Sequence, residues 1–186
     1  MVNLNHKLLV LAGPTAVGKG TVARHIIEHN PQVVLSVSAT TRAPRPGEVD
    51  GVSYYFLTDH EFDELIATNQ MLEFAVVHGK HRYGTPKQPV EAALAEGKAV
   101  LLEIDIQGAR QVKQRMPQAT TVFLAPPSWD ELVRRLEGRA TENPEEMARR
   151  LETARVELAA QGEFDHVIVN DEVAKCAAAV VRLIMS

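Results

Sequence analysis

The chain has 186 residues, of which 45% are hydrophobic and 24% charged, a balance typical of one globular domain with a substantial core. The net charge of −4 argues against a broad basic surface for nucleic acid, so functional positive charge must be concentrated locally. No apolar run approaches the roughly 20 residues that cross a bilayer, and no signal-peptide pattern is present. We therefore expect a cytoplasmic protein with neither a membrane nor a nucleic acid as partner.

The first predicted strand leads into a glycine-containing loop. Residues 7–12 are an apolar run, and helical spacing of Val22, Ile26 and Ile27 follows the loop. Strand, glycine loop and helix form the context of a phosphate-binding loop, or P-loop, whose backbone N–H groups and helix N-terminus bind phosphate oxygens. A turn that binds nothing is the disfavoured alternative. We expect a nucleoside triphosphate to contact Gly13, Pro14, Thr15, Ala16, Val17, Gly18, Lys19, Gly20 and Thr21.

Lys19 supplies the ammonium group that such a loop directs to the β- and γ-phosphates. The usual pattern continues with Ser or Thr, whose hydroxyl reaches Mg²⁺. Here Gly20 follows the lysine and Thr21 comes one place later. Thr21 is therefore the hydroxyl that remains for the metal ion.

A polar, arginine-containing loop follows the second predicted strand, 33–38. Asn30-Pro31 ends the first helix, and residues 39–48 then carry Arg42 and Arg45 among prolines and a glycine. Order resumes at once, with a strand at 52–57, a capping box at Thr58 and Glu61, a strand at 71–77 and a turn at 78–86. We therefore interpret residues 39–86 as a small folded insertion and not as a flexible linker.

Two carboxylates end a buried strand in the middle of the chain. A helix from about Pro89 to Gly97 leads to a nearly continuous apolar run at 99–105, where alternation predicts Glu103 and Asp105 on one face. A buried parallel strand has no structural use for two acids, so a functional site is favoured over a surface edge. In P-loop enzymes an acid in this place commonly orients hydrated Mg²⁺.

The C-terminal part continues the alternation of strands and helices. Strands are expected at 120–125 and 166–170, and helices open at Ser128 and at Asn143-Pro144. A last helix carries the single cysteine, Cys176, on its apolar face, where we expect a buried thiol. The alternation predicts an α/β fold with a parallel sheet covered on both faces.

Five arginines surround the polar break between the helices that open at Ser128 and at Asn143-Pro144. Ion pairs with the abundant glutamates nearby are the ordinary explanation for most of them. These arginines are Arg134, Arg135, Arg139, Arg149 and Arg150.

The insertion carries side chains suited to an anionic acceptor. Arg42 and Arg45 offer planar forks for a phosphate, and Tyr54 and Tyr83 offer hydroxyls that can bond phosphate oxygens. Glu73 lies in an otherwise apolar strand. The residues therefore point to a second nucleotide whose phosphate meets the arginines.

Guanine is the base that suits Glu73. It presents N1–H and N2–H₂ donors side by side to a carboxylate, whereas adenine would leave the buried charge unpaired, at a cost of about 1–3 kcal/mol or more. Ser38 and Thr85 can donate to the O6 or N7 acceptors of guanine. The insertion therefore favours a guanine nucleotide over an adenine nucleotide.

Over nearly its full length the chain resembles bacterial guanylate kinases. The matching stretches together are highly specific, although none would be so alone. They are the loop at 13–21, Ser36–Arg42, Pro44–Glu48, Tyr83–Thr85, Glu103–Gly108, Pro126–Ser128, Arg135-Leu136 with Arg139, and Val169–Asp171.

The resemblance implies one guanylate kinase-like domain with a P-loop NTPase three-layer core around a parallel sheet. The core spans about 1–38, 87–127 and 150–186. An inserted GMP-binding subdomain spans about 39–86, and a mobile lid about 128–149.

The resemblance also implies roles for individual side chains. Guanine is contacted by Ser38, Glu73, Thr85 and Glu103. The acceptor phosphate is held by Arg42, Arg45, Tyr54 and Tyr83. The transferring phosphoryl group meets the catalytic residues Lys19, Arg42, Arg139 and Arg150. ATP lies on the loop with its base near Asn170, and Mg²⁺ lies near Thr21 and, through water, Asp105.

The expected reaction is ATP-dependent phosphorylation of GMP, and of dGMP, by direct in-line transfer, with Mg²⁺ as cofactor, in purine nucleotide metabolism and GMP recycling. Two alternatives remain. A P-loop kinase acting on a phosphorylated sugar would use arginines but would not need Ser38, Glu73 and Thr85 together. A scaffold module that binds phosphopeptides usually has a degraded phosphate loop, whereas the loop here is intact.

Overall fold

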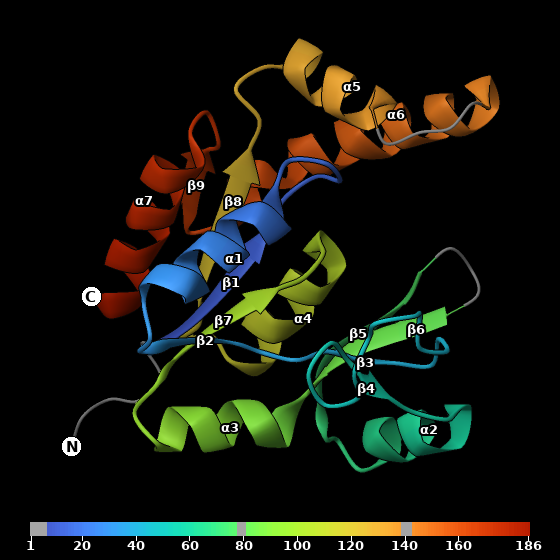
Figure 1. Cartoon of the computed structure of the whole chain (residues 1–186), viewed down its shortest axis with the longest axis vertical. Coiled ribbons are helices and arrows are strands. Elements are labelled where there is room, and N and C mark those ends of the chain that lie inside the picture. Colours follow the sequence, from blue (N-terminus) through green and yellow to red (C-terminus); the bar gives the residue numbers. More distant parts are fainter. Residues whose placement is uncertain (1–6, 78–80, 139–142) are drawn as a thin grey trace.

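A five-stranded parallel sheet forms the centre of the computed structural model, which describes residues 7–77, 81–138 and 143–186. The strand order is β2-β7-β1-β8-β9, so the first strand of the chain lies in the middle (Figure 1). The predicted parallel sheet is confirmed. Its strands are β1 (Leu8–Ala12), β2 (Val33–Leu35), β7 (Ala99–Glu103), β8 (Thr120–Ala125) and β9 (His166–Val169).

Helices cover both faces of this sheet. Helices α1 (Lys19–His29) and α7 (Val173–Met185) pack on one face, and α3 (Lys87–Ala95) and α4 (Ile106–Arg115) on the other. Alternate residues of β1 therefore enter two separate apolar clusters, which explains why the strand is hydrophobic without interruption. The three-layer α/β core is confirmed, and Cys176 is buried within it as expected.

The chain between 39 and 86 builds a second sheet of order β4-β3-β6-β5. Helix α2 (Asp59–Ala67) begins at the predicted capping box and packs on this sheet through Phe62, which lies with Ala39 and Met71 in a small core. The strands are β3 (Ala39–Thr40), β4 (Tyr55–Phe56), β5 (Met71–Val77) and β6 (His81–Pro86). The insertion therefore has its own sheet, although its exact limits remain a prediction.

The prediction of a turn at 78–86 is wrong for residues 81–86, the part of this segment that the structure describes. Residues 81–86 form strand β6, which pairs antiparallel with β5 so that Glu73 lies opposite Thr85. The glycine at 84 permits this pairing, because a Cβ there would lie 2.7 Å from the carbonyl oxygen of Glu73. A sequence rich in glycine and polar residues therefore forms a strand, since its partner strand satisfies the backbone.

Helix α4 joins the two sheets. The Gln111 side chain bonds both the N–H and the carbonyl oxygen of Phe74 in β5, at 3.1 and 2.8 Å. Arg115 donates to the carbonyl oxygen of Leu72 at 2.6 Å. The start of β5, which contains Glu73, is therefore fixed against the core.

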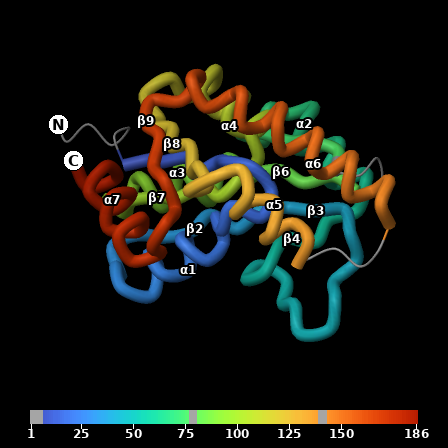
Figure 2. Tube along the Cα trace, turned by 90° about the horizontal axis from the view of Figure 1, so that it is seen from above, coloured from blue at the N-terminus to red at the C-terminus, as the bar shows by residue number. Residues whose placement is uncertain are grey.

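Helices α5 (Trp129–Glu137) and α6 (Pro144–Ala159) lie at the end of the molecule toward which β1 and β8 run (Figure 1), and Figure 2 views the molecule from that end. The Ser128 and Asn143 side chains cap them as predicted, with Pro144 in the first turn of α6. A 3-10 turn, Ala160–Glu163, continues from α6, and none of the helices in the described segments could cross a membrane. The predicted lid ends at about residue 149, but helix α6 continues through this position without a break. The limits of the lid therefore stay a prediction.

We expect Val180→Ala to lower the free energy of unfolding by about 2 kcal/mol, because Val180 is fully buried between α7 and the sheet and its loss leaves a cavity. Val156→Ala in α6 is the matched control, since that valine is 65% exposed and its loss should change the value by no more than about 0.5 kcal/mol. Urea unfolding measures both. Equal effects at the two positions would contradict the described packing.

Candidate functional site

The loop between β1 and α1 adopts the backbone that a phosphate-binding loop requires. Gly13, Ala16 and Gly18 have φ angles of 152°, 66° and 101°. A Cβ at Gly13 would lie 2.4 Å from the carbonyl oxygen of Leu124, and one at Gly18 would lie 2.7 Å from the Asn170 side-chain nitrogen. The described first turn of α1 contains no acidic residue, and its N-cap is Gly18, which has no side chain to cap it, so the positive end of the helix dipole is not offset by an acid of that turn.

Lys19 is bound to the loop itself. Its ammonium donates to the carbonyl oxygens of Gly13 at 2.7 Å and Pro14 at 3.2 Å. Glu103, at the end of β7, lies beside the loop as well, with Oε1 3.4 Å from where a Cβ at Gly20 would lie. Burial raises the pKa of the Glu103 carboxyl, and the charge of Lys19 opposes that effect. A Cβ at Gly20 would make ordinary van der Waals contact with this carboxylate, so Glu103 is a direct neighbour of the start of α1.

Asn170 and Arg135 support the second half of the loop. Both donate to the carbonyl oxygen of Val17, at 2.9 and 3.1 Å, and Asn170 is buried. The cavity beside them has a volume of about 380 Å³ and includes Thr21 and Asp171. Asn170, which was expected to lie near the ATP base, lines this cavity.

The strand expected at 99–105 is shorter in the structure, so the alternation that would place Glu103 and Asp105 on one face does not extend to Asp105. The strand ends at Glu103, and Asp105 is the N-cap of α4, with Oδ1 accepting from the N–H of Gly108 at 2.7 Å. An Asp at an N-cap satisfies a backbone donor that the helix leaves unpaired, which explains the early end of the strand. Asp105 lines a cavity of about 640 Å³ together with side chains of α6.

A buried carboxylate and a hydroxyl form a polar pair in the second sheet. Glu73 is 5% exposed and accepts a hydrogen bond from Thr85 Oγ1 at 2.6 Å. Burial raises the pKa of Glu73 to about 7, the bond from Thr85 opposes this rise, and the charge of Asp105 adds to it. A Cβ at Gly108 would lie 2.6 Å from Glu73 Oε2, so the glycine makes room for the carboxylate.

Arg42 lies at the centre of an aromatic and acidic cluster. Its Nε donates to the Tyr83 hydroxyl at 3.2 Å, and the guanidinium lies 5.3 Å from the centre of the Tyr54 ring. The fork that was expected to hold a phosphate is occupied by the Glu48 carboxylate, at 3.0 Å from Nη1 and 2.9 Å from Nη2. The bonds from Arg42 hold the pKa of Glu48 below its usual range.

Arg45 and Ser38 border the cluster. The side chain of Arg45 is exposed, and its backbone N–H donates to Glu48 Oε2 at 2.7 Å. Ser38 is half-buried, and its carbonyl oxygen accepts from the N–H of Tyr55. The structure thus brings the predicted acceptor residues to one region, with Glu48 as an unforeseen partner.

The lid residues are placed in part. Arg139 lies outside the described residues, whereas Arg150 pairs with Glu146 on α6 and lines a cavity of about 580 Å³ that also borders Thr15 and Arg149. Glutamate pairing was the ordinary expectation for most of these arginines, and Arg134, Arg135 and Arg150 all show it.

Glu157 contacts the loop, and sequence reasoning did not find it. Its Oε2 accepts from the N–H of Thr15 at 3.1 Å, and burial raises its pKa. The only signal available was its spacing of seven residues from Arg150, which places both on one side of α6.

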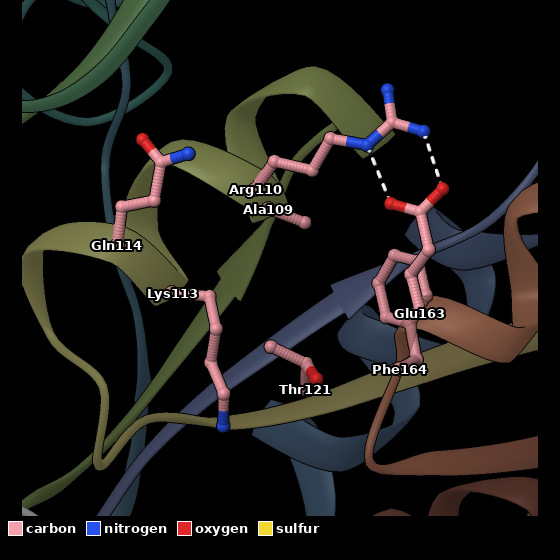
Figure 3. Close-up of a pocket in the computed structure, with 7 residues that line it drawn as sticks. All are labelled: Ala109, Arg110, Lys113, Gln114, Thr121, Glu163 and Phe164. Carbon is pink, nitrogen blue, oxygen red and sulfur yellow. Dashed lines mark hydrogen bonds and ion pairs between the residues drawn. The ribbon is translucent and has the colours of Figure 1, made fainter.

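A further cavity, of about 220 Å³, lies between α4 and the segment after α6 (Figure 3). Arg110 and Lys113 line it, and each of them forms an ion pair with a carboxylate. Arg110 makes two bonds to the Glu163 carboxylate, at 2.6 and 2.7 Å, and Lys113 bonds Asp165 at 2.8 Å. The cavity therefore lies beside two ion pairs that connect α4 with the segment after α6.

The loop, the parallel sheet and the attached second sheet define the chain as a P-loop kinase. A family model described as guanylate kinase matches residues 5–186. The chain belongs to the guanylate kinase family.

Individual relatives agree with this assignment. The guanylate kinase of Leifsonia xyli is 64% identical over 178 residues, 96% of this chain and 70% of that protein. The guanylate kinase of Nocardia farcinica is 61% identical over 97% of this chain and 94% of that protein.

Solved structures agree as well. The crystal structure of guanylate kinase from Anaplasma phagocytophilum has a TM-score of 0.74 and 34% identity, and the match covers 96% of this chain and 84% of that one. A shikimate kinase from Bacteroides thetaiotaomicron, at a TM-score of 0.50 and 13% identity over 96% of this chain and 98% of that one, shares the fold alone.

We expect Gly18→Ala to weaken binding of an ATP analogue about tenfold or more. Alanine at a φ of 101° is strained by roughly 1–2 kcal/mol, and its Cβ would lie 2.7 Å from the Asn170 nitrogen. Gly162→Ala is the control, because nothing lies within 4 Å of a Cβ there. Calorimetric titration of both variants measures the effect, and unchanged binding by Gly18→Ala would contradict the loop's proposed use.

Proposed function

We propose that this chain transfers the γ-phosphoryl group of ATP directly to GMP, giving ADP and GDP. One observation carries the proposal beyond family membership: the segment Glu103–Gly108 contacts both halves of the site. Glu103 lies against the phosphate loop at Gly20, and Gly108 lies against Glu73 in the second sheet. Because these contacts are five residues apart on one segment, a nucleotide on the loop and a base at Glu73 would be bound in adjacent regions of the molecule.

On the donor side, the loop N–H groups and Lys19 would hold the phosphates of ATP, with its base near Asn170. The oxygen ligands close to the loop, Thr21 and Glu103, suit a hard cation such as Mg²⁺. Bound there, Mg²⁺ would neutralise charge on the phosphate oxygens. The position of Glu103 beside the loop supports a role on the donor side in addition to the guanine contact implied by the resemblance.

On the acceptor side, Glu73 would accept the N1–H and N2–H₂ donors of guanine while Thr85 and Ser38 complete the polar lining. Asp105 belongs to this side as well as to the metal side, because it caps the same turn of α4 that contacts Glu73. A buried carboxylate left unpaired by adenine is the physical basis for selectivity.

The acceptor phosphate would meet Arg45, the Tyr54 and Tyr83 hydroxyls, and Arg42. Arg139 and Arg150 would add positive charge from the lid as it closes over the transferring group. In-line transfer needs positioning and charge stabilisation more than covalent chemistry, so fixed cations and exclusion of water supply the rate.

We expect Lys19→Ala to lower kcat for GMP phosphorylation by about 100-fold or more, since preorganised charge at the transferring group is typically worth that factor. Lys98→Ala is the control, because this exposed lysine pairs with Glu96 just before β7, at the opposite end of that strand from Glu103 and the loop. A coupled assay of ADP formation measures both variants. Retention of activity by Lys19→Ala would contradict the proposed loop function.

The same assay separates the alternative functions when GMP, dGMP, AMP and a sugar phosphate are each offered as acceptor. The proposal requires turnover of GMP, and dGMP should follow it. Preference for a sugar phosphate would favour the alternative of a P-loop kinase that acts on a phosphorylated sugar. No turnover with any acceptor would favour the scaffold module that binds phosphopeptides.

We expect binding of guanosine below about pH 7 to release a proton, because the free Glu73 carboxyl has a pKa of about 7 and guanine donors favour its charged form. Affinity should therefore rise with pH up to about 7 and then level off. Calorimetry in two buffers of different ionisation enthalpy counts the protons, and guanosine avoids titration of a phosphate.

Glu73→Gln provides the control for proton release. Glutamine cannot titrate, so the variant should bind guanosine more weakly and with no dependence on pH in this range. Release of the same number of protons by Glu73→Gln would show that another group is responsible.

The pH dependence of folding stability has the opposite sign to that of guanosine affinity. The raised pKa of Glu73 stabilises the free protein at low pH, and this contribution is lost as pH rises from 4.5 to about 7.

A further inference from the structure

Arg42 has few donors left for a phosphate. A guanidinium carries five N–H groups. Nε donates to Tyr83, and Nη1 donates to the carbonyl oxygen of Ala43 at 2.7 Å and to Glu48. Nη2 makes one bond to Glu48. Within the described residues, a single N–H of Nη2 therefore remains without an acceptor.

Glu48 connects both arginines of the acceptor loop. Its Oε2 accepts from Nη1 of Arg42 and also from the backbone N–H of Arg45 at 2.7 Å. The backbone N–H of Glu48 in turn donates to the carbonyl oxygen of Arg45 at 3.0 Å. One carboxylate thus fixes the orientation of the first arginine and the backbone position of the second.

The substrate phosphate can either displace Glu48 or bind beside it. Displacement would leave a carboxylate, already bonded to the Arg45 N–H, next to an arriving dianion. It would also disturb a guanidinium that lies over the Tyr54 and Phe56 rings, at 5.3 and 5.8 Å. The ion pair is well shielded, with side-chain exposures of 10% for Arg42 and 21% for Glu48, so the bidentate bond is costly to break.

We propose that Glu48 is a positioning residue for the acceptor phosphate and that it stays bound to Arg42 when the substrate arrives. The phosphate then receives the remaining Nη2 N–H of Arg42, the exposed guanidinium of Arg45 and the tyrosine hydroxyls. The proposal rests on the proposed function, because it presumes that the acceptor is a nucleoside monophosphate. It makes Glu48 a determinant of phosphate binding without contact to the phosphate.

The test compares Glu48→Ala with the wild-type protein, using GMP and guanosine as calorimetric ligands. We expect GMP affinity to fall about tenfold or more, since a charge-assisted bond is worth roughly that factor, and guanosine affinity to stay within about twofold. In steady-state assays KM for GMP should rise by the same factor while KM for ATP is unchanged. A purely structural role would weaken GMP and guanosine alike.

A second variant and a control complete the design. Glu48→Gln keeps the side-chain size and one acceptor oxygen, so it should lose less GMP affinity than Glu48→Ala, and it decides the question if the alanine variant does not fold. Glu61→Ala removes another carboxylate of the insertion, one that accepts from the Thr58 N–H and hydroxyl and only caps α2. It should leave the ratio of GMP to guanosine affinity unchanged.

Three outcomes would overturn the proposal. Tighter GMP binding by Glu48→Ala would show that the carboxylate competes with the phosphate and is displaced. Equal losses for GMP and guanosine would show a structural role, and wild-type affinity in both Glu48 variants would show no role. If wild-type protein binds neither GMP nor guanosine, the proposed function itself fails, whatever Glu48 does.

Discussion

The parallel pairing of β1 with β7 is the constraint on which the site depends. Leu11 lies opposite Glu103 in this register, and the N–H of Ile104 donates to the carbonyl oxygen of Leu11 at 3.3 Å. Because parallel strands end at the same edge of a sheet, the phosphate loop and the acidic segment begin side by side. Without this register, Glu103 would not lie beside Gly20, and the donor side would lose one of its two adjacent carboxylates, the other being Glu157 at the Thr15 N–H.

Helix α4 extends this constraint to the acceptor side. Its N-terminal turn is capped by Asp105 and has no side chain at residue 108, which leaves space for Glu73. One turn further on, Gln111 holds both backbone polar groups of Phe74, the residue after Glu73. A buried carboxylate needs this degree of support, since its charge is unfavourable unless its partners are fixed. The helix thus serves as the rigid element between two binding regions.

Local patterns allowed prediction of much of this architecture. The strand, loop and helix around Lys19 are contiguous in sequence, and the caps at Thr58, Ser128 and Asn143 are short-range hydrogen bonds, so all four could be found without a fold. Pairings between distant segments were harder. Glu73 and Thr85 were each identified as polar residues for guanine, yet the residues around Thr85 were predicted to turn, because a strand is stabilised by its neighbour more than by its own composition.

The acidic residues show the other limit. Alternation placed Glu103 and Asp105 on one face, but alternation applies only while the strand continues, and the cap of α4 ends it between them. The glutamate at 48 was part of the family pattern, whereas its capture of the Arg42 fork depends on a loop conformation that no periodicity specifies. Glu157 gave no distinctive signal among the many glutamates of α6.

Pairing of cations with acids or carbonyl groups recurs around the site, and it has an energetic consequence. Arg42 is held by Glu48, Arg150 by Glu146, and the Lys19 ammonium by two loop carbonyl oxygens. Each side chain is therefore ordered before any phosphate arrives, which avoids an ordering cost of about 0.5–1.5 kcal/mol per side chain on binding. The carboxylates also reduce the net positive potential, so affinity for an anion must come from geometry more than from excess charge. A site built in this way can discriminate between anions by the placement of its few remaining donors, and the single N–H left on Arg42 is one of them.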